Sequence, residues 1–190
     1  MVGHKVTDLA ETGFVSLPGS TMAIATTTAP TRKAWPLSLL LFLSIAGSAQ
    51  STGFVKKFQP LADSLSLAYG IPTAVILGVS IIESGSGTSR NCRLLHNYFG
   101  IVGRNALLRT HGIRSRYRQY ADATASFTDF CRVISRKKFY PRLKGNPDHR
   151  LWTEAISKAG YSEVPAVWRQ RVNDAIRKNK LATLAPHPES

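Results

Sequence analysis

The stretch that decides the fold runs from residue 71 to residue 87 and reads IPTAVILGVSIIESGSG. Its apolar residues do not follow a single stripe but occupy nearly all sides, which is typical of a helix buried on most of its surface. Pro72 suits the first turn of a helix, and Gly85 and Gly87 provide a stop signal. The stretch therefore predicts a buried helix that ends just before Gly85.

Glu83 is the one charged residue of this stretch. Burial beside an apolar helix disfavours a carboxylate, the C-terminal end of a helix carries partial negative charge, and no Lys or Arg lies within six residues. These effects raise the pKa of the carboxyl group, as a general acid requires, and the glycines that follow allow another molecule to approach closely. The alternative is a solvated glutamate at a frayed helix end, the common situation for this residue type.

Further helices are expected on both sides of this stretch. Asp122 is suited to cap a helix over 123–139, and a second helix is expected from Asp148 to a stop at Gly160. A basic amphipathic helix follows over 165–181. The inward positions follow helical spacing: Phe54, Phe58, Leu61, Leu65 and Ala68 before Gly70, then Phe127, Phe130, Cys131 and Ile134 after Asp122, and finally Trp152 and Trp168.

Residues 104–120 lack helical periodicity. The pair His111–Gly112 suits a turn, and residues 114–120 alternate in the manner of a strand, so that a short β-hairpin is expected here. This segment contains five arginines and no acid.

The N-terminal part of the sequence has the order of a secretory signal peptide. Arg32 and Lys33 precede a short apolar run, and small residues follow up to Ala49. We expect residues 1–49 to be an extension with a signal peptide, with the true start at Met22, and the protein to be exported to the periplasm or secreted. An uncleaved anchor is the alternative. Residues 50–181 would form the catalytic domain and 182–190 a flexible tail.

Composition and charge narrow the class of protein. The chain has 190 residues, of which 43% are hydrophobic, enough for one domain with a core. Its formal net charge of +14 favours polyanionic partners, among which nucleic acid, anionic lipid and cell-wall polymer are not separated by charge alone. The two cysteines, Cys92 and Cys131, predict a disulfide in an exported chain, and two separate buried thiols are the alternative.

Four blocks of the sequence, in order, resemble glycoside hydrolase family 73, the peptidoglycan N-acetylglucosaminidases. They are YGIPTAVILGVSIIESGSGTSR, NYFGIVG, RYRQYADATASFTDFCRVI and LWTEAISKAGYSEVPAVWRQRV, and the resemblance covers residues 54–181. It implies a mainly α, lysozyme-like α+β fold, in which a helical domain carries a cleft and a small β-hairpin lobe.

The resemblance also implies roles for individual residues. It assigns Glu83 as the general acid and Tyr161 as the catalytic-site tyrosine, and it places Asn97, Tyr98 and Phe99 on the cleft floor. For Tyr98 and Phe99 core packing is the alternative.

The sequence departs from the family pattern in the hairpin segment, where many members carry a second carboxylate. A mechanism that needs only one carboxylic acid is therefore expected, in which the 2-acetamido oxygen of the substrate attacks the anomeric carbon. The nearest acids, Asp122 and Asp129, lie in the following helix. We expect Arg114, Arg116 and Arg118 to bind lactyl or peptide carboxylates of the wall, and a solvated basic face is the alternative.

The function expected from these features is that of an exported endo-β-N-acetylglucosaminidase that cuts peptidoglycan glycan strands. A muramidase, a lytic transglycosylase and a catalytically dead wall-binding module are the alternatives. The five histidines have no metal-ligand spacing, so that no metal and no cofactor are expected. We also expect a monomer, with no nucleic-acid partner and no stable membrane insertion.

Overall fold

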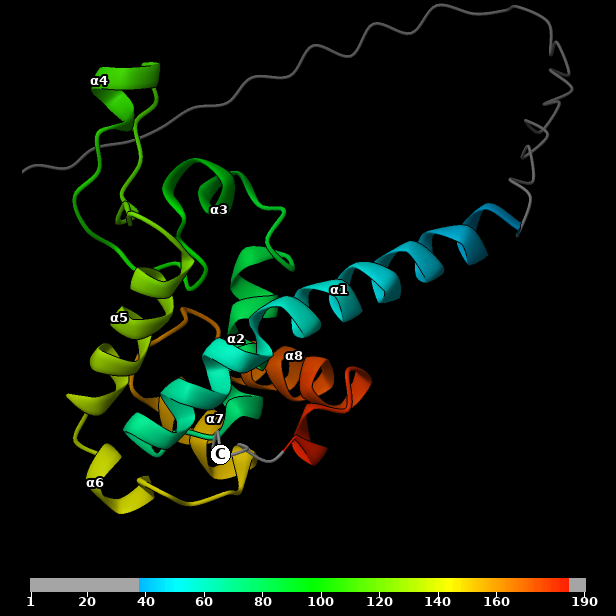
Figure 1. Cartoon of the computed structure of the whole chain (residues 1–190), viewed down its shortest axis with the longest axis vertical. Coiled ribbons are helices and arrows are strands. Elements are labelled where there is room, and N and C mark those ends of the chain that lie inside the picture. Colours follow the sequence, from blue (N-terminus) through cyan, green and yellow to red (C-terminus); the bar gives the residue numbers. More distant parts are fainter. Residues whose placement is uncertain (1–37, 185–190) are drawn as a thin grey trace, which may run out of the picture. The chain divides into compact units, whose positions relative to one another are not determined.

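The computed structural model describes residues 38–184, with side chains from residue 50 onward. Within this range the chain forms helices and no extended strand (Figure 1). The elements are α1 (Ser38–Tyr69), α2 (Thr73–Ser84), α3 (Arg90–Leu95), α4 (Leu107–His111), α5 (Ala123–Ser135), α6 (Tyr140–Leu143), α7 (His149–Lys158), α8 (Pro165–Lys178) and the 3₁₀-helix η1 (Leu181–Thr183).

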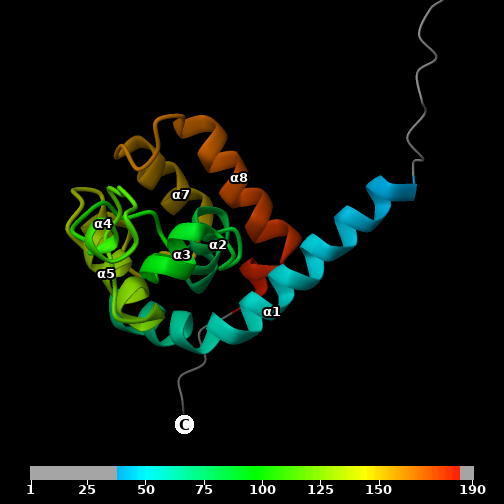
Figure 2. The same ribbon diagram turned by 90° about the horizontal axis from the view of Figure 1, so that it is seen from above.

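Helix α2 lies in the middle of the other helices (Figure 2). It packs against α1, α7, α8 and η1, and every side chain from Thr73 to Ile81 is buried, as the apolar pattern predicts. The approach of α8 is close because Gly78 has no side chain: a Cβ there would lie 2.6 Å from Cγ1 of Ile176. The helix ends at Gly85, which adopts the left-handed conformation with φ of +58°.

Helix α1 buries the stripe that its spacing predicts, with one correction. Phe54, Phe58 and Leu65 are buried and Leu61 is half-buried against the core, whereas Ala68 is exposed and Ala62 lies inward instead. The stripe follows steps of four and three residues, and Ala62 continues it from Phe58. Ala68 lies three residues after Leu65, a step that the stripe allows, so its exposure comes from the packing at this end of α1 and not from the spacing.

The caps and inward positions of the later helices are confirmed. The carboxylate of Asp122 accepts a hydrogen bond from the backbone N–H of Ala125 at the start of α5, and Asp148 caps α7 in the same way. The predicted inward residues of α5, α7 and α8 are buried: Phe127, Phe130, Cys131, Ile134, Trp152 and Trp168.

The segment 101–120 differs from the predicted hairpin. Two antiparallel arms are joined by one isolated β-bridge between Val102 and Tyr117, and the short helix α4 occupies the tip. The side chain of Asn105 replaces part of a strand ladder, because its amide donates to the carbonyls of Ser115 and Tyr117, both at 2.8 Å. The alternation of residues 114–120 therefore reflects side chains on an extended arm and not a strand.

The predicted disulfide is not present: Cys92 and Cys131 are both buried free thiols. They lie in different surroundings, since Cys92 contacts Tyr98 and Cys131 lies within the hydrophobic core of α5. Burial raises the pKa of the Cys131 thiol to about 12, so that the thiolate needed for disulfide exchange is strongly disfavoured. The alternative of two separate buried thiols is the correct one.

The signal-peptide prediction concerns residues 1–49. Of these, residues 1–37 lie outside the described part and 38–49 form the start of α1, so that the cleavage site stays a prediction. Residues 185–190 of the expected tail also lie outside it. None of the helices in residues 38–184 combines the length and apolarity needed to cross a membrane.

The close contact between α2 and α8 gives a stability prediction. Gly78→Ala should lower the free energy of unfolding by roughly 1–2 kcal/mol, because overpacking against Ile176 outweighs the better helix propensity of alanine. Gly53→Ala is the matched control, since Gly53 is also in a helix but has no atom within 4 Å of its Cβ position. Urea denaturation gives the free energy of unfolding of both variants and of the wild type. Equal or higher stability of Gly78→Ala relative to Gly53→Ala would contradict the packing described.

Candidate functional site

Glu83 lies in the last turn of α2, where the buried helix reaches the surface, and its side chain is half-buried. Its Oε1 accepts a hydrogen bond of 2.7 Å from the indole Nε1–H of Trp168 in α8. Trp168 is itself only 5% exposed, so that the indole is held in place by the core. The two residues are 85 positions apart in the sequence, and the packing of α8 on α2 brings them together.

The environment raises the pKa of Glu83, as expected for a general acid. Burial of the carboxyl group is the main cause, and the Trp168 hydrogen bond and the positive charge of Arg171 act in the opposite direction. Burial outweighs both, and the carboxyl group keeps its proton to a higher pH than an exposed glutamate.

The second oxygen of Glu83 faces a glycine. A Cβ on Gly100 would lie 3.0 Å from Oε2 of Glu83 and 4.0 Å from Cε1 of Tyr117, and Gly100 has a φ of +66°. Both the space and the backbone conformation therefore favour glycine at this position. An indole N–H can only donate, so Oε1 accepts, and Oε2 is the oxygen better placed to carry the proton of the acid form.

Tyr161 lies beside this carboxyl group. Its hydroxyl donates a hydrogen bond of 2.7 Å to the carbonyl of Phe99, and its ring centroid lies 5.3 Å from that of Trp168. Burial, and then the negative charge of Glu83, raise the pKa of Tyr161 well above its usual value. The phenol stays neutral, and it links the turn before Gly100 to the end of α7.

Asn97 organises the turn on which Gly100 lies. Its side chain is buried and makes four hydrogen bonds to backbone groups: the amide donates to the carbonyls of Ile101 and Arg118, and the oxygen accepts from the N–H groups of Phe99 and Ile101. Because both polar atoms of its side chain are bound to backbone groups, Asn97 holds the turn in place.

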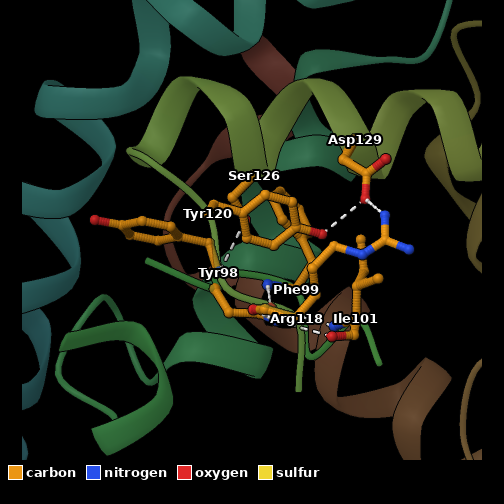
Figure 3. Close-up of polar contacts among 8 residues, drawn as sticks. Tyr98, Phe99, Ile101, Arg118, Tyr120, Ser126 and Asp129 are labelled. Atoms are coloured by element: carbon orange, nitrogen blue, oxygen red, sulfur yellow. Dashed lines mark hydrogen bonds and ion pairs between the residues drawn. The ribbon is translucent and has the colours of Figure 1, made fainter. Parts of the chain in front are cut away.

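The aromatic residues of this turn differ in exposure. Phe99 is buried and stacks on Phe130, with ring centroids 4.2 Å apart, so that core packing describes it. Tyr98 is partly buried and packs against Phe58 and Phe127. Figure 3 shows its ring on the side away from the Asp129 carboxylate.

Arg118 is engaged within the protein. It forms an ion pair of 2.6 Å with Asp129, and the hydroxyl of Tyr120 donates to the same carboxylate oxygen at 2.7 Å (Figure 3). This cluster fastens the second arm of segment 101–120 to α5. Arg114 and Arg116, in contrast, are exposed and line an open groove on the other side of the arm.

Most acidic side chains of residues 50–184 other than Glu83 are engaged elsewhere. Asp63 accepts from Thr73, and the others act as helix caps or ion-pair partners, namely Asp122, Asp129, Asp148, Glu154 and Asp174. Glu163 is the exception in this range, because it is exposed and none of the described groups binds its carboxylate. It lies two residues after Tyr161.

Trp168 and Arg171 are the residues that the sequence reasoning missed. The spacing correctly predicts that Trp168 is buried, but no local signal connects its indole with Glu83. Trp168 and Arg171 are three positions apart on α8, about one helical turn, so they lie on the same face of the helix. This spacing is the one sequence signal that could have suggested that both act on the Glu83 carboxyl group. In the described part of the chain, no three His, Cys, Asp or Glu side chains are grouped so that they could hold a metal ion.

Comparison with solved structures shows the same fold. The catalytic domain of the autolysin Auto from Listeria monocytogenes superposes with a TM-score of 0.58 at 15% identity, covering 80% of this chain and 98% of that one. The truncated glycoside hydrolase domain of FlgJ from Salmonella typhimurium gives 0.55 at 20% identity, covering 68% and 97%. A peptidoglycan hydrolase mutant from Sphingomonas sp. A1 gives 0.53 at 20% identity, covering 68% and 95%.

Comparison at the level of sequence families is more specific. No curated protein matches the chain. The family model "Glucosaminidase", described as mannosyl-glycoprotein endo-β-N-acetylglucosaminidase, matches residues 59–181. This range is well over half of the chain and contains Glu83, Gly100, Tyr161 and Trp168. The chain therefore belongs to the glucosaminidase family, glycoside hydrolase family 73, as its sequence motifs predict.

Proposed function

We propose that the protein hydrolyses the β-1,4 bond after N-acetylglucosamine in the glycan strands of bacterial peptidoglycan, with Glu83 as the general acid. The observation that carries this proposal is the Glu83 carboxyl group, whose Oε1 is bound by Trp168 while Oε2 faces the space left by Gly100. Two of the structural neighbours are an autolysin and a peptidoglycan hydrolase, which supports the choice of polymer. Export to the periplasm or the medium, where this polymer lies, is part of the proposal.

Glu83 would act twice in the reaction. In the first step Oε2 gives its proton to the glycosidic oxygen as the bond from that oxygen to the anomeric carbon breaks. The 2-acetamido oxygen of the same sugar attacks the anomeric carbon and forms a cyclic oxazolinium ion. In the second step the Glu83 carboxylate takes a proton from water, and the water oxygen bonds to the anomeric carbon as the bond from that carbon to the acetamido oxygen breaks. This opens the oxazolinium ring, regenerates the acetamido group and restores the acid.

The scarcity of free carboxylates supports this substrate-assisted route. A second protein carboxylate would be needed as base or nucleophile in the two-carboxylate mechanisms. Asp122 and Asp129 are engaged as a cap and in an ion pair, which leaves the exposed Glu163 as the free candidate in residues 50–184. The Tyr161 hydroxyl already donates to Phe99, so that its oxygen remains free to accept the N–H of the acetamido group. Accepting this bond would orient the acetamido oxygen toward the anomeric carbon.

The first prediction from the proposed function concerns the identity of the acid. Glu83→Gln should lower the release of reducing ends from purified sacculi by a factor of about 10²–10⁴, because it removes the proton donor. Mass spectrometry of the wild-type products should show reducing N-acetylglucosamine ends. Reducing or anhydro N-acetylmuramic acid ends would instead identify a muramidase or a lytic transglycosylase.

Two controls accompany this variant. Its circular dichroism and its co-sedimentation with sacculi should match those of the wild type, which separates loss of chemistry from loss of fold or binding. More than about a tenth of the wild-type activity in the variant would contradict the assignment of Glu83. Binding without any release by the wild type would identify a wall-binding module.

The second prediction concerns the residues on α8 that act on Glu83. Because the indole N–H stabilises the carboxylate, Trp168→Phe should raise the pKa of Glu83 further. The active form is protonated, so the alkaline limb of the pH profile of kcat/KM should move to higher pH. In addition, kcat should fall about tenfold, because the carboxyl group loses its fixed orientation. Arg171→Gln should move the limb in the same direction while kcat at its plateau stays close to the wild-type value, because Arg171 has no hydrogen bond to the carboxylate. An unmoved limb in both variants would contradict the proposed environment of Glu83.

The third prediction concerns the stereochemical outcome. Substrate assistance requires retention, so proton NMR should detect the β-anomer of the product first, and de-N-acetylated glycan should bind but react very slowly. Glu163→Gln should keep most of the activity, since Glu163 is the free acid in residues 50–184 that could otherwise supply a base. Initial release of the α-anomer, together with loss of activity in Glu163→Gln, would show that Glu163 is the second carboxylate of an inverting enzyme.

A further inference from the structure

We propose that the protein has an anion-binding subsite beside its catalytic carboxyl group, and that this subsite takes the lactyl and stem-peptide carboxylates of the glycan being cut. The subsite is a groove of about 850 Å³ between α3 and the two arms of segment 101–120. Four arginines line this groove, the arginine groove, namely Arg90, Arg104, Arg114 and Arg116. This inference rests on the proposed function, because the carboxylates belong to the peptidoglycan substrate.

The charge of the arginine groove is uncompensated. None of its four arginines forms an ion pair within residues 50–184, and no acidic residue lines the groove. Arg118 shows the contrast, since it leaves the same arm toward α5 and is neutralised there by Asp129. Four like charges on one concave surface repel one another, and a bound anion removes that repulsion.

The walls of the groove are held by hydrogen bonds and not by the arginines themselves. Asn105 ties the first arm to the second through the carbonyls of Ser115 and Tyr117, and the N–H of Gly103 donates to the carbonyl of Arg116 at 2.9 Å. The guanidinium of Arg116 lies 5.7 Å from the ring centroid of Tyr117. The guanidinium groups are therefore presented from an ordered backbone, while their donors remain available.

Tyr117 connects the groove with the catalytic site. It lines the arginine groove, and its ring edge lies 4.0 Å from the Cβ position of Gly100, the same point that lies 3.0 Å from Oε2 of Glu83. A glycan strand at Glu83 therefore has the groove on its flank. An anion that enters the groove is best supplied by the sugar next to the cleaved bond.

The chemistry of the substrate supplies such an anion. In peptidoglycan the sugar next to N-acetylglucosamine carries a lactyl ether, which ends either in a free carboxylate or in a peptide with its own carboxylates. A guanidinium group binds a carboxylate through two parallel hydrogen bonds, a geometry that lysine does not offer. The groove would thus distinguish peptidoglycan from a neutral N-acetylglucosamine polymer.

The test combines a double variant with a chemically neutralised substrate. Arg114→Gln/Arg116→Gln should raise KM on intact sacculi about five- to tenfold at low salt, with kcat within about twofold of the wild type, as expected for two exposed charge pairs. Conversion of the sacculus carboxylates to methylamides should raise the wild-type KM similarly. The two increases in KM should not add when the variant acts on the amidated substrate, because mutation and amidation remove the same interaction.

Controls separate a carboxylate-binding groove from a general effect of positive charge, from a phosphate-binding site and from failure of the proposed function. Lys138→Gln/Arg142→Gln removes two exposed positive charges near α6, at the end of the molecule opposite α4 (Figure 1), and should change KM by less than about twofold. Equal KM values for the groove variant and the wild type, or additive effects of mutation and amidation, would overturn the inference. Loss of the KM difference after hydrofluoric acid extraction of phosphodiester polymers would also overturn it, in favour of a phosphate ligand. Failure of the wild type to cut any sacculi would refute the proposed function instead.

Discussion

The structure depends on one constraint: a carboxyl group must be kept at the end of a helix that is otherwise almost entirely buried. Helix α2 is buried from Thr73 to Ile81, and Glu83 follows where this burial begins to open toward solvent. Helix α8 approaches α2 closely at Gly78, and one and a half turns further along α2 it brings the Trp168 indole to Oε1 of Glu83. The same packing that builds the core therefore orients the acid.

This arrangement has a cost in stability. A carboxyl group whose pKa is raised in the folded state binds its proton more tightly there than in the unfolded chain. The free energy of unfolding contributed by Glu83 therefore falls as pH rises from the ordinary pKa of glutamate through the raised pKa of the folded state. The Trp168 hydrogen bond and Arg171 reduce this penalty without removing it. The fold therefore carries a cost for holding this carboxyl group, the kind of cost that the proposed role of Glu83 as general acid would account for.

Local patterns predicted much of this architecture. The apolar run of α2, the stop at Gly85 and the cap at Asp122 each depend on residues within one or two helical turns, and all three are found in the structure. The features that were missed depend on contacts far apart in the sequence. The Trp168 bond to Glu83, the ion pair of Arg118 with Asp129 and the separation of Cys92 from Cys131 arise from how the helices pack, which periodicity does not encode. The strand expected over 114–120 failed for a related reason, because its partner arm offers a single bridge and the Asn105 side chain.

The most direct test of the account is the protonation of Glu83 itself. Carbon NMR of protein labelled at the glutamate Cδ, with Glu83→Gln to identify the resonance, measures the titration midpoint of this carboxyl group. The account predicts a midpoint above the ordinary glutamate value, and a Trp168 Nε1–H resonance that shifts with the same midpoint, because the indole donates to that carboxyl group. A midpoint at or below the ordinary value, or an indole resonance that does not follow it, would contradict the account.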